Sequence, residues 1–360
     1  MNEKLTMGEN YSIESKILGE ERKYTIYLPE DYEKSDERYS VLFVVNADYQ
    51  AYFVHAASVA QLLFDRGCIP PMIVVGVHTK DHAKDFFPVP HPRIPDSGKA
   101  DLFLEFILTE IRPLIANSFR TNDFSILYGV SNSGMFTVYT LLTHPDAFNG
   151  YIAGSPMLGW ATEVFHEKAQ ALFSSRDSLS RYLYMEYGEN DYDRVCETVP
   201  DFAKLLDKMA PKDLVWSSKV LKNVGHGPIT VLYNGLSMIF PEWQVSTEKG
   251  MELGMEGVES FYASLSARYS IDVKIPSEVL SDIGIQWILK EEAEHGRPFI
   301  EKLVELYPTS EGGYYLLGII EERMGNFEGA ADLYRKALEL NPEYPQAKEK
   351  LAHLKNEGKI

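Results

Sequence analysis

Cysteine is scarce in this chain of 360 residues, which contains only Cys68 and Cys196. Two cysteines cannot form the disulfide framework of a small secreted domain, and neither lies at metal-ligand spacing from histidine or acidic residues. We expect both to pack as small apolar side chains. The sequence therefore predicts no metal site and no cofactor held by thiolates.

Basic residues and long apolar runs are also few. The chain has 35 Lys and Arg against 53 Asp and Glu, a formal charge of −18. Phosphate backbones and anionic lipid surfaces are bound mainly through Lys and Arg, so we expect no nucleic acid and no membrane as partner. No apolar run reaches the ~18 residues of a transmembrane helix. The polar segment 1–12 lacks a signal-peptide core, which favours the cytoplasm; a periplasmic or secreted location stays open if a signal peptide has been removed.

Strand and helix patterns alternate over residues 1–246. Short apolar runs rich in β-branched and aromatic residues are typical of strands buried on both faces of a parallel sheet. Six such runs occupy residues 39–46, 72–77, 124–128, 151–154, 182–187 and 213–221. Residues 11–18 and 22–28 look like an antiparallel pair that precedes them. Helical patterns between the runs imply right-handed crossovers and a three-layer α/β domain.

The remaining chain has a different texture. Residues 247–276 are polar and contain three glycines, followed by a helical pattern near Phe261, and we expect a connector there. Residues 277–360 are helical in pattern, and residues 302–308 recur as 336–342, an offset of 34. This segment resembles a tetratricopeptide repeat (TPR), whose pattern is matched at Tyr314, Leu317, Gly318, Ala330, Tyr334, Ala337 and Pro342. We expect a TPR-like domain over 277–360 with residues 347–356 as its capping helix, and a homodimer formed through its exposed faces.

A candidate nucleophile lies in the segment Gly129-Val130-Ser131-Asn132-Ser133-Gly134, between a predicted strand and a predicted helix. A nucleophile elbow needs a serine on such a turn, with small residues two places before and after it. Ser133 replaces the usual second glycine but is still small. The alternative is an ordinary Gly/Ser turn that caps a helix.

A nucleophilic serine needs a base, and the base needs an orienting carboxylate. In this fold the chain order is serine, acid, histidine. Asp191 follows the strand at 182–187, at the sheet edge where active sites of parallel sheets lie, with Glu189 and Asp193 as alternatives. His226 follows the last strand between two glycines and completes the order.

An oxyanion hole needs two donors. We expect one to be the backbone N–H of Asn132, the residue after the serine. The second should come from the loop after the strand at 39–46, from the N–H of Asp48 or of Tyr49.

Residues 10–245 resemble an esterase family of α/β-hydrolases that includes enterochelin-type siderophore esterases, S-formylglutathione hydrolase, feruloyl esterases and mycolyltransferases. Further matching segments are residues 22–29, 85–88, 119–121 and 155–160. The family pattern Gly-x-x-Asp falls on Gly188 and Asp191. The family's Asp-Gly pair is Asn46-Ala47 here, a departure that concerns the oxyanion loop.

The resemblance implies a serine esterase that needs no cofactor. Ser131 would attack the ester carbonyl, His226 would act as general base and then general acid, and Asp191 would hold the imidazole. Aromatic and apolar residues on the segments expected around the site predict a small or aromatic ester as substrate. They are Tyr49, Phe86, Phe87, Met157, Trp160 and Tyr192.

Three other functions remain open. A siderophore ester ranks lower because residues 79–84, next to Asp85, contain no arginine that would bind an anionic substrate. An acyltransferase could use the same triad. The chain could also be a binding protein whose TPR part acts while its hydrolase half is inert.

Overall fold

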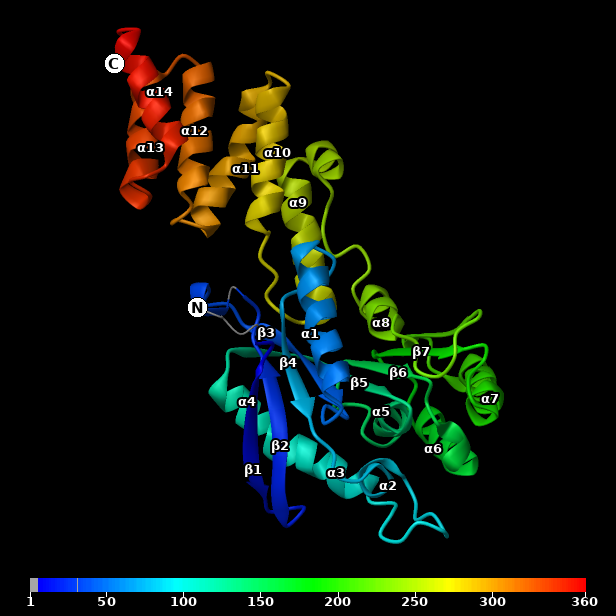
Figure 1. Ribbon diagram of the computed structural model, residues 1–360. Helices are drawn as coiled ribbons and strands as arrows, with labels where there is room; N and C mark the ends of the chain where they lie inside the picture. Colours follow the sequence, from blue (N-terminus) through cyan, green and yellow to red (C-terminus); the bar gives the residue numbers. More distant parts are fainter. Residues whose placement is uncertain (1–5, 31) are drawn as a thin grey trace. The chain divides into compact units, whose positions relative to one another are not determined.

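The computed structural model describes residues 6–30 and 32–360, which form two compact units that divide after Trp243 (Figure 1). The expectation drawn from residues 1–12 rests partly on residues 1–5, which lie outside the described part. Among the described helices, none combines the length and the apolar character needed to cross a bilayer.

The N-terminal unit is built on one eight-stranded sheet. Its strands are β1 (Glu9–Ser15), β2 (Glu20–Tyr27), β3 (Tyr39–Val45), β4 (Met72–Val77), β5 (Thr121–Val130), β6 (Gly150–Gly154), β7 (Tyr182–Gly188) and β8 (Val215–Leu221). Their order across the sheet is β1-β2-β4-β3-β5-β6-β7-β8. Strand β2 is antiparallel to both of its neighbours, β1 and β4. Strands β3 to β8 are all parallel to one another. The predicted antiparallel pair and the predicted parallel strands are therefore present.

Helices cover both faces of this sheet. They are α1 (Gln50–Asp65), α2 (His82–Phe86), α3 (Ala100–Phe106), α4 (Arg112–Ser118), α5 (Asn132–Thr143), α6 (Thr162–Ser175), α7 (Asp193–Met209) and α8 (Val231–Ile239). On β6, Ile152 faces Gly235 of α8, whereas Tyr151 and Ala153 belong to the core on the other face. Alternate strand residues point to opposite faces, so the predicted three-layer α/β arrangement is confirmed.

The C-terminal unit is helical. Its helices are α9 (Thr247–Tyr269), α10 (Ser277–Leu289), α11 (Ala293–Leu306), α12 (Glu311–Arg323), α13 (Phe327–Leu340) and α14 (Pro345–Asn356). The expected connector at 247–276 is wrong for most of its length, because α9 occupies it and groups with the C-terminal unit. Its glycines favoured a connector, but Val258, Tyr262, Leu265 and Tyr269 form a buried helical face. Gly254, at φ 68°, kinks this helix.

The 34-residue offset reflects two equivalent helix pairs. A Cβ atom on Gly284 would lie 2.3 Å from Cδ1 of Ile300, and one on Gly318 would lie 2.4 Å from Cε1 of Tyr334. Ile300 and Tyr334 are themselves 34 positions apart. Each glycine thus allows the two helices of its repeat to approach closely, as the TPR pattern requires.

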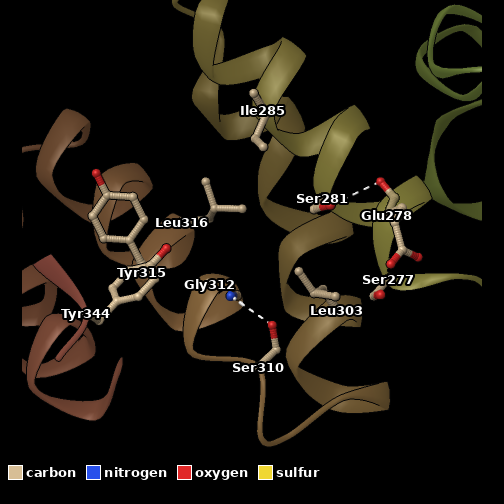
Figure 2. Close-up of a pocket in the computed structure, with 11 residues that line it drawn as sticks. Ser277, Glu278, Ser281, Ile285, Leu303, Ser310, Gly312, Tyr315, Leu316 and Tyr344 are labelled. Atoms are coloured by element: carbon tan, nitrogen blue, oxygen red, sulfur yellow. Dashed lines mark hydrogen bonds between the residues drawn. The ribbon is translucent and has the colours of Figure 1, made fainter. Parts of the chain in front are cut away.

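A groove of about 380 Å³ lies on the C-terminal unit, among α10, α11, α12 and the start of α14 (Figure 2). Tyr315 and Tyr344 stand at one side with ring centroids 5.5 Å apart, and Ser277, Glu278 and Ser281 line the other. Glu278 is the only charged residue among those that line it.

Candidate active site

Ser131 occupies a strained turn between β5 and α5. It has φ 64° and ψ −122°, a left-handed backbone conformation that is uncommon for residues other than glycine. Its N–H donates to the carbonyl oxygen of Gly154 on β6 at 2.8 Å. A Cβ on Gly129 would lie 2.4 Å from the Ser133 carbonyl oxygen, and one on Gly134 would lie 2.7 Å from that of Gly154. Both glycines are therefore needed for the turn.

Ser133, which stands where a second glycine was expected, has a structural role. Its side chain is buried, its Oγ donates to the carbonyl oxygen of Val130 at 2.7 Å, and it accepts the Val130 N–H at 2.9 Å. Because its hydroxyl is satisfied inside the turn, serine is tolerated at this position. The close approach of α5 to β6 falls instead on Gly134.

Asp191 and His226 form a close pair. His226 Nδ1 lies 2.6 Å from Oδ1 of Asp191, which also accepts the N–H of Tyr192 at 2.7 Å. The Asp191 side chain is fully buried, and that of His226 is 25% exposed. Burial raises the pKa of the Asp191 carboxyl, but hydrogen bonds from His226, Ser155 and the Tyr192 N–H outweigh this effect and hold the pKa below its ordinary value. The carboxylate is thus ionised at neutral pH.

The two alternative acids have other surroundings. Glu189 accepts the N–H of Asn223 at 3.2 Å, and Asp193 begins α7. Of the three candidates, Asp191 is the one with a hydrogen bond to His226 among the described residues.

Several contacts bring the serine turn and the Asp191–His226 pair to one edge of the sheet. Gly227 passes so close to β5 that a Cβ there would lie 3.3 Å from Cγ1 of Val130, the neighbour of Ser131. The N–H of Gly227 donates to Oγ of Ser155 at 2.8 Å, and that Oγ donates to Oδ2 of Asp191 at 2.5 Å. The three predicted residues therefore follow the carboxyl ends of β5, β7 and β8.

The loop after β3 contains the expected second oxyanion donor. The Ala47 N–H donates to the carbonyl oxygen of Val77 at 3.2 Å, and the Tyr49 N–H donates to the carbonyl oxygen of Asn46 at 3.3 Å. Since the Tyr49 N–H is engaged in this turn, Asp48 is the better of the two candidates. Asn46 has φ 76°, a region that asparagine tolerates.

The Asp48 side chain is held to one side of this loop. Its Oδ1 accepts the N–H of Thr79 at 3.1 Å, and its Oδ2 lies 4.0 Å from Nε2 of His82. Burial raises the pKa of the Asp48 carboxyl, while His82, the Thr79 N–H and its own N–H lower it to a net value below the ordinary one.

The predicted pocket residues divide into three groups. Phe86 is fully buried against Phe103 and Phe136, so its assignment to the pocket was wrong; α2 turns it into the core. Met157 is also largely buried. Tyr49 and Tyr192 are about 60% exposed, and the Tyr192 ring lies 4.6 Å from that of His226.

Phe87 is also buried in the core, so its assignment to the pocket was wrong as well; it stacks beneath Trp160, which belongs to an aromatic and cationic cluster that the sequence did not predict in full. Their ring centroids are 5.3 Å apart, and His91 lies edge-on at 5.3 Å from Trp160. The guanidinium of Arg194 lies 4.3 Å above the Trp160 ring. The sequence argument looked for arginine near Asp85 and missed Arg194, although it stands three positions after Asp191 at the start of α7.

This sheet order, with a serine on the strained turn after β5, defines the class of the N-terminal unit as an α/β-hydrolase. The family model described as "Putative esterase" matches residues 15–195, half of the chain. The chain belongs to this esterase family and is an enzyme of the hydrolase type. A tetratricopeptide repeat model matches residues 313–344 of the C-terminal unit.

Individual relatives agree with this assignment. The chain is 39% identical over 67 residues to the ferri-bacillibactin esterase BesA of Bacillus subtilis, and 33% identical over 81 residues to the siderophore triacetylfusarinine C esterase of Aspergillus fumigatus. These stretches cover 18% and 22% of this chain, and only 23% and 28% of the two relatives. The crystal structure of an IroE-like serine hydrolase from Shewanella oneidensis is similar at a TM-score of 0.72 and 25% identity, covering 83% of this chain and 99% of that one.

Proposed function

We propose that this esterase hydrolyses carboxylic esters through Ser131, with His226 and Asp191 as its proton-transfer partners. The observation that carries the proposal is the 2.6 Å contact between His226 Nδ1 and buried Asp191, on a loop that runs beside the strained serine turn. With Nδ1–H donating to the carboxylate, Nε2 is left as the base.

In this mechanism His226 Nε2 accepts the proton of the Ser131 hydroxyl as its oxygen attacks the ester carbonyl. The backbone N–H groups of Asn132 and Asp48 stabilise the resulting oxyanion. His226 then donates the proton to the departing alcohol, which leaves an acyl-enzyme. Water, activated by His226 in the same way, releases the acid and restores the serine.

Substitution of the serine tests this proposal. Ser131→Ala should abolish hydrolysis of p-nitrophenyl acetate and labelling by a fluorophosphonate probe. Ser133→Gly is the matched control, because Ser133 lies two residues away and is bonded inside the turn; this variant should still be labelled. Retained activity in Ser131→Ala would refute the assignment of the nucleophile, and absence of labelling in the native protein would favour a binding protein with an inert hydrolase half.

For the substrate, a small or aromatic ester is supported by the rings of Trp160, which is partly exposed, and of Tyr192, which lies 4.6 Å from the His226 ring. A siderophore ester is a second candidate, because both siderophore esterase relatives match the chain and Arg194 offers a cation over Trp160. Arginine stacked on an aromatic ring suits an anionic aromatic group.

Paired substrates distinguish these candidates. Arg194→Leu should lower kcat/KM for an aryl ester with a carboxylate or catecholate on its acyl group and leave kcat/KM for the neutral aryl ester unchanged. An equal loss on both would remove the argument for an anionic substrate. Addition of an alcohol acceptor tests acyl transfer, which should appear as ester product at the expense of free acid.

We also propose that the C-terminal unit forms a homodimer. The open groove with the partly exposed Tyr315, Leu316 and Tyr344 supports this, since aromatic side chains are enriched in protein interfaces. Light scattering of the full chain should give twice the chain mass of 40.9 kDa, and Leu316→Asp should reduce it to that of one chain. A single-chain mass for the unaltered protein would contradict the proposal.

A further inference from the structure

Ser155 is a buried hydroxyl residue at the end of β6 that the proposed chemistry does not use directly. It is 0% exposed and has φ 42°, a left-handed backbone conformation. Its Oγ accepts the N–H of Gly227 at 2.8 Å and lies 2.5 Å from Oδ2 of Asp191. Because a hydroxyl has one hydrogen and Gly227 already supplies its own, the hydroxyl hydrogen goes to the carboxylate.

We propose that Ser155 is a positioning residue for the ester hydrolysis, which fixes Asp191 relative to the loop that carries His226. This inference rests on the proposed function of Ser131, Asp191 and His226. One hydroxyl ties the carboxylate on one side to the backbone next to the histidine on the other. It thereby keeps the Asp191 carboxylate and the His226 loop at fixed positions relative to the end of β6.

The bonding of Asp191 explains why a hydroxyl is needed at this place. Oδ1 is bonded to His226 and to the Tyr192 N–H, and Oδ2 is bonded to Ser155. Without that hydroxyl, a buried carboxylate oxygen would lose its donor, and the carboxylate could rotate away from the imidazole. The Gly227 N–H would also lose its acceptor, so both ends of the link would be left unpaired.

Anchoring of the histidine loop to the sheet does not depend on Ser155 alone. Four residues after His226, Oγ1 of Thr230 donates to Oε1 of Glu186 on β7 at 2.5 Å. The Glu186 carboxylate is buried and accepts further bonds from Tyr184 and Asn234. Thr230 is therefore a matched control, because it anchors the same loop through a hydroxyl but has no bond to Asp191.

Removal of the Ser155 hydroxyl has a predictable effect on pH dependence. The hydroxyl stabilises the ionised carboxylate, so its loss raises the pKa of the Asp191 carboxyl. The other titratable or charged groups next to Asp191 are Glu189 and Tyr192 on this loop and Asp193, Arg194 and Cys196 in the first turn of α7. The Cys196 Sγ lies 3.7 Å from the Asp191 carbonyl oxygen. None of them has a hydrogen bond to Ser155 among the described residues, so the substitution leaves their pairing unchanged.

The experiment compares Ser155→Ala with Thr230→Val in the full chain, with p-nitrophenyl acetate as substrate. For Ser155→Ala we expect kcat/KM at neutral pH to fall on the order of tenfold. The acid limb of its pH profile should move upward by roughly half a pH unit or more. Thr230→Val should lower the melting temperature but leave the acid limb in place. An unmoved acid limb in Ser155→Ala, or an equal movement in both variants, would overturn the proposal.

A double-mutant cycle with Asp191→Ala adds a readout that a merely structural role would not change. If Ser155 acts through the carboxylate, Ser155→Ala should cause little further loss of kcat/KM once the carboxylate is absent. Additive losses would show that Ser155 acts by another route and would refute the inference. Fluorophosphonate labelling of native protein and of Ser131→Ala separately tests the nucleophile, so failure of the positioning role and failure of the proposed function give different results.

Discussion

The conversion of Asp191 to asparagine is the substitution whose outcome the geometry predicts most closely. Oδ1 of Asp191 accepts two N–H groups, from His226 and from Tyr192, whereas Oδ2 faces the Ser155 hydroxyl. If the asparagine NH₂ took the place of Oδ1, it would meet the Tyr192 N–H, donor against donor. The amide oxygen should therefore remain toward His226, and the NH₂ group should turn to Ser155 Oγ.

This orientation determines the size of the effect. With the amide oxygen toward Nδ1, the imidazole keeps the tautomer that leaves Nε2 as base, and only the negative charge is lost. Charges about 4 Å apart interact by about 4 kcal/mol at an effective dielectric constant of 20, which corresponds to roughly a thousandfold in rate. We expect kcat to fall by about 10²- to 10³-fold, less than the ~10⁴ seen in a serine protease whose asparagine reverses the tautomer.

The assay is steady-state hydrolysis of p-nitrophenyl acetate from pH 5 to pH 9. Glu189→Gln is the matched control, since Glu189 stands two positions earlier and is bonded to Asn223, and it should keep kcat within about threefold of the unaltered enzyme. A loss of less than about tenfold in Asp191→Asn would show that Asp191 does not support the histidine. A loss of 10⁴ or more would show that the amide orientation deduced above is wrong.

Three further predictions concern stability. The hydroxyl of Ser178 and the Leu179 N–H lower the pKa of Asp213 from 3.8 to about 2, so its carboxylate contributes stability above pH 3.8 that is lost as the pH falls through 2. Asp213→Asn should therefore reduce the free energy of unfolding at pH 7, and urea titrations should show that this difference vanishes near pH 2. Arg22 forms a fully buried ion pair with Asp85 at 2.6 Å, so Arg22→Ala should lower the free energy of unfolding by about 3–5 kcal/mol in a denaturant titration. The double variant with Asp85→Ala should recover part of this loss, and a loss under about 1 kcal/mol in Arg22→Ala would contradict the prediction. Gly318→Ala should cost about 1–3 kcal/mol because its Cβ would lie 2.4 Å from a facing tyrosine ring, whereas Gly312→Ala, with no atom nearer than 3.9 Å, should cost nothing; equal melting temperatures would refute this.

Much of the candidate site could be predicted from the sequence because its residues follow strands in a definite order. A serine between small residues on a strand-to-helix turn, an acid after a later strand and a histidine after the last strand are local features. The carboxyl ends of parallel strands lie at one edge, so these features meet once the strands pair. The family pattern Gly-x-x-Asp already favoured Asp191 over Glu189 and Asp193, and the hydrogen bond to His226 supports the same choice.

Other parts of the site were not accessible to such reasoning. Phe86 and Phe87 are adjacent in sequence and both are buried, yet Phe86 packs against Phe103 and Phe136 whereas Phe87 stacks on Trp160. Their different roles depend on the direction in which α2 ends. Arg194 is an ordinary exposed helix residue until its guanidinium is seen over the Trp160 ring.

By itself, the sequence determined the two-part organisation, the alternation of strands and helices, the repeat of 34 residues and the serine turn. These features depend on hydrophobic periodicity, glycine positions and turn residues, which act over a few neighbours. Only the tertiary structure decided that the helical pattern near Phe261 extends over residues 247–269 and belongs to the second unit, and that Ser155 links Asp191 to Gly227. A hydrogen bond between residues 36 positions apart leaves no local pattern, because it arises only when β6 and β7 lie side by side.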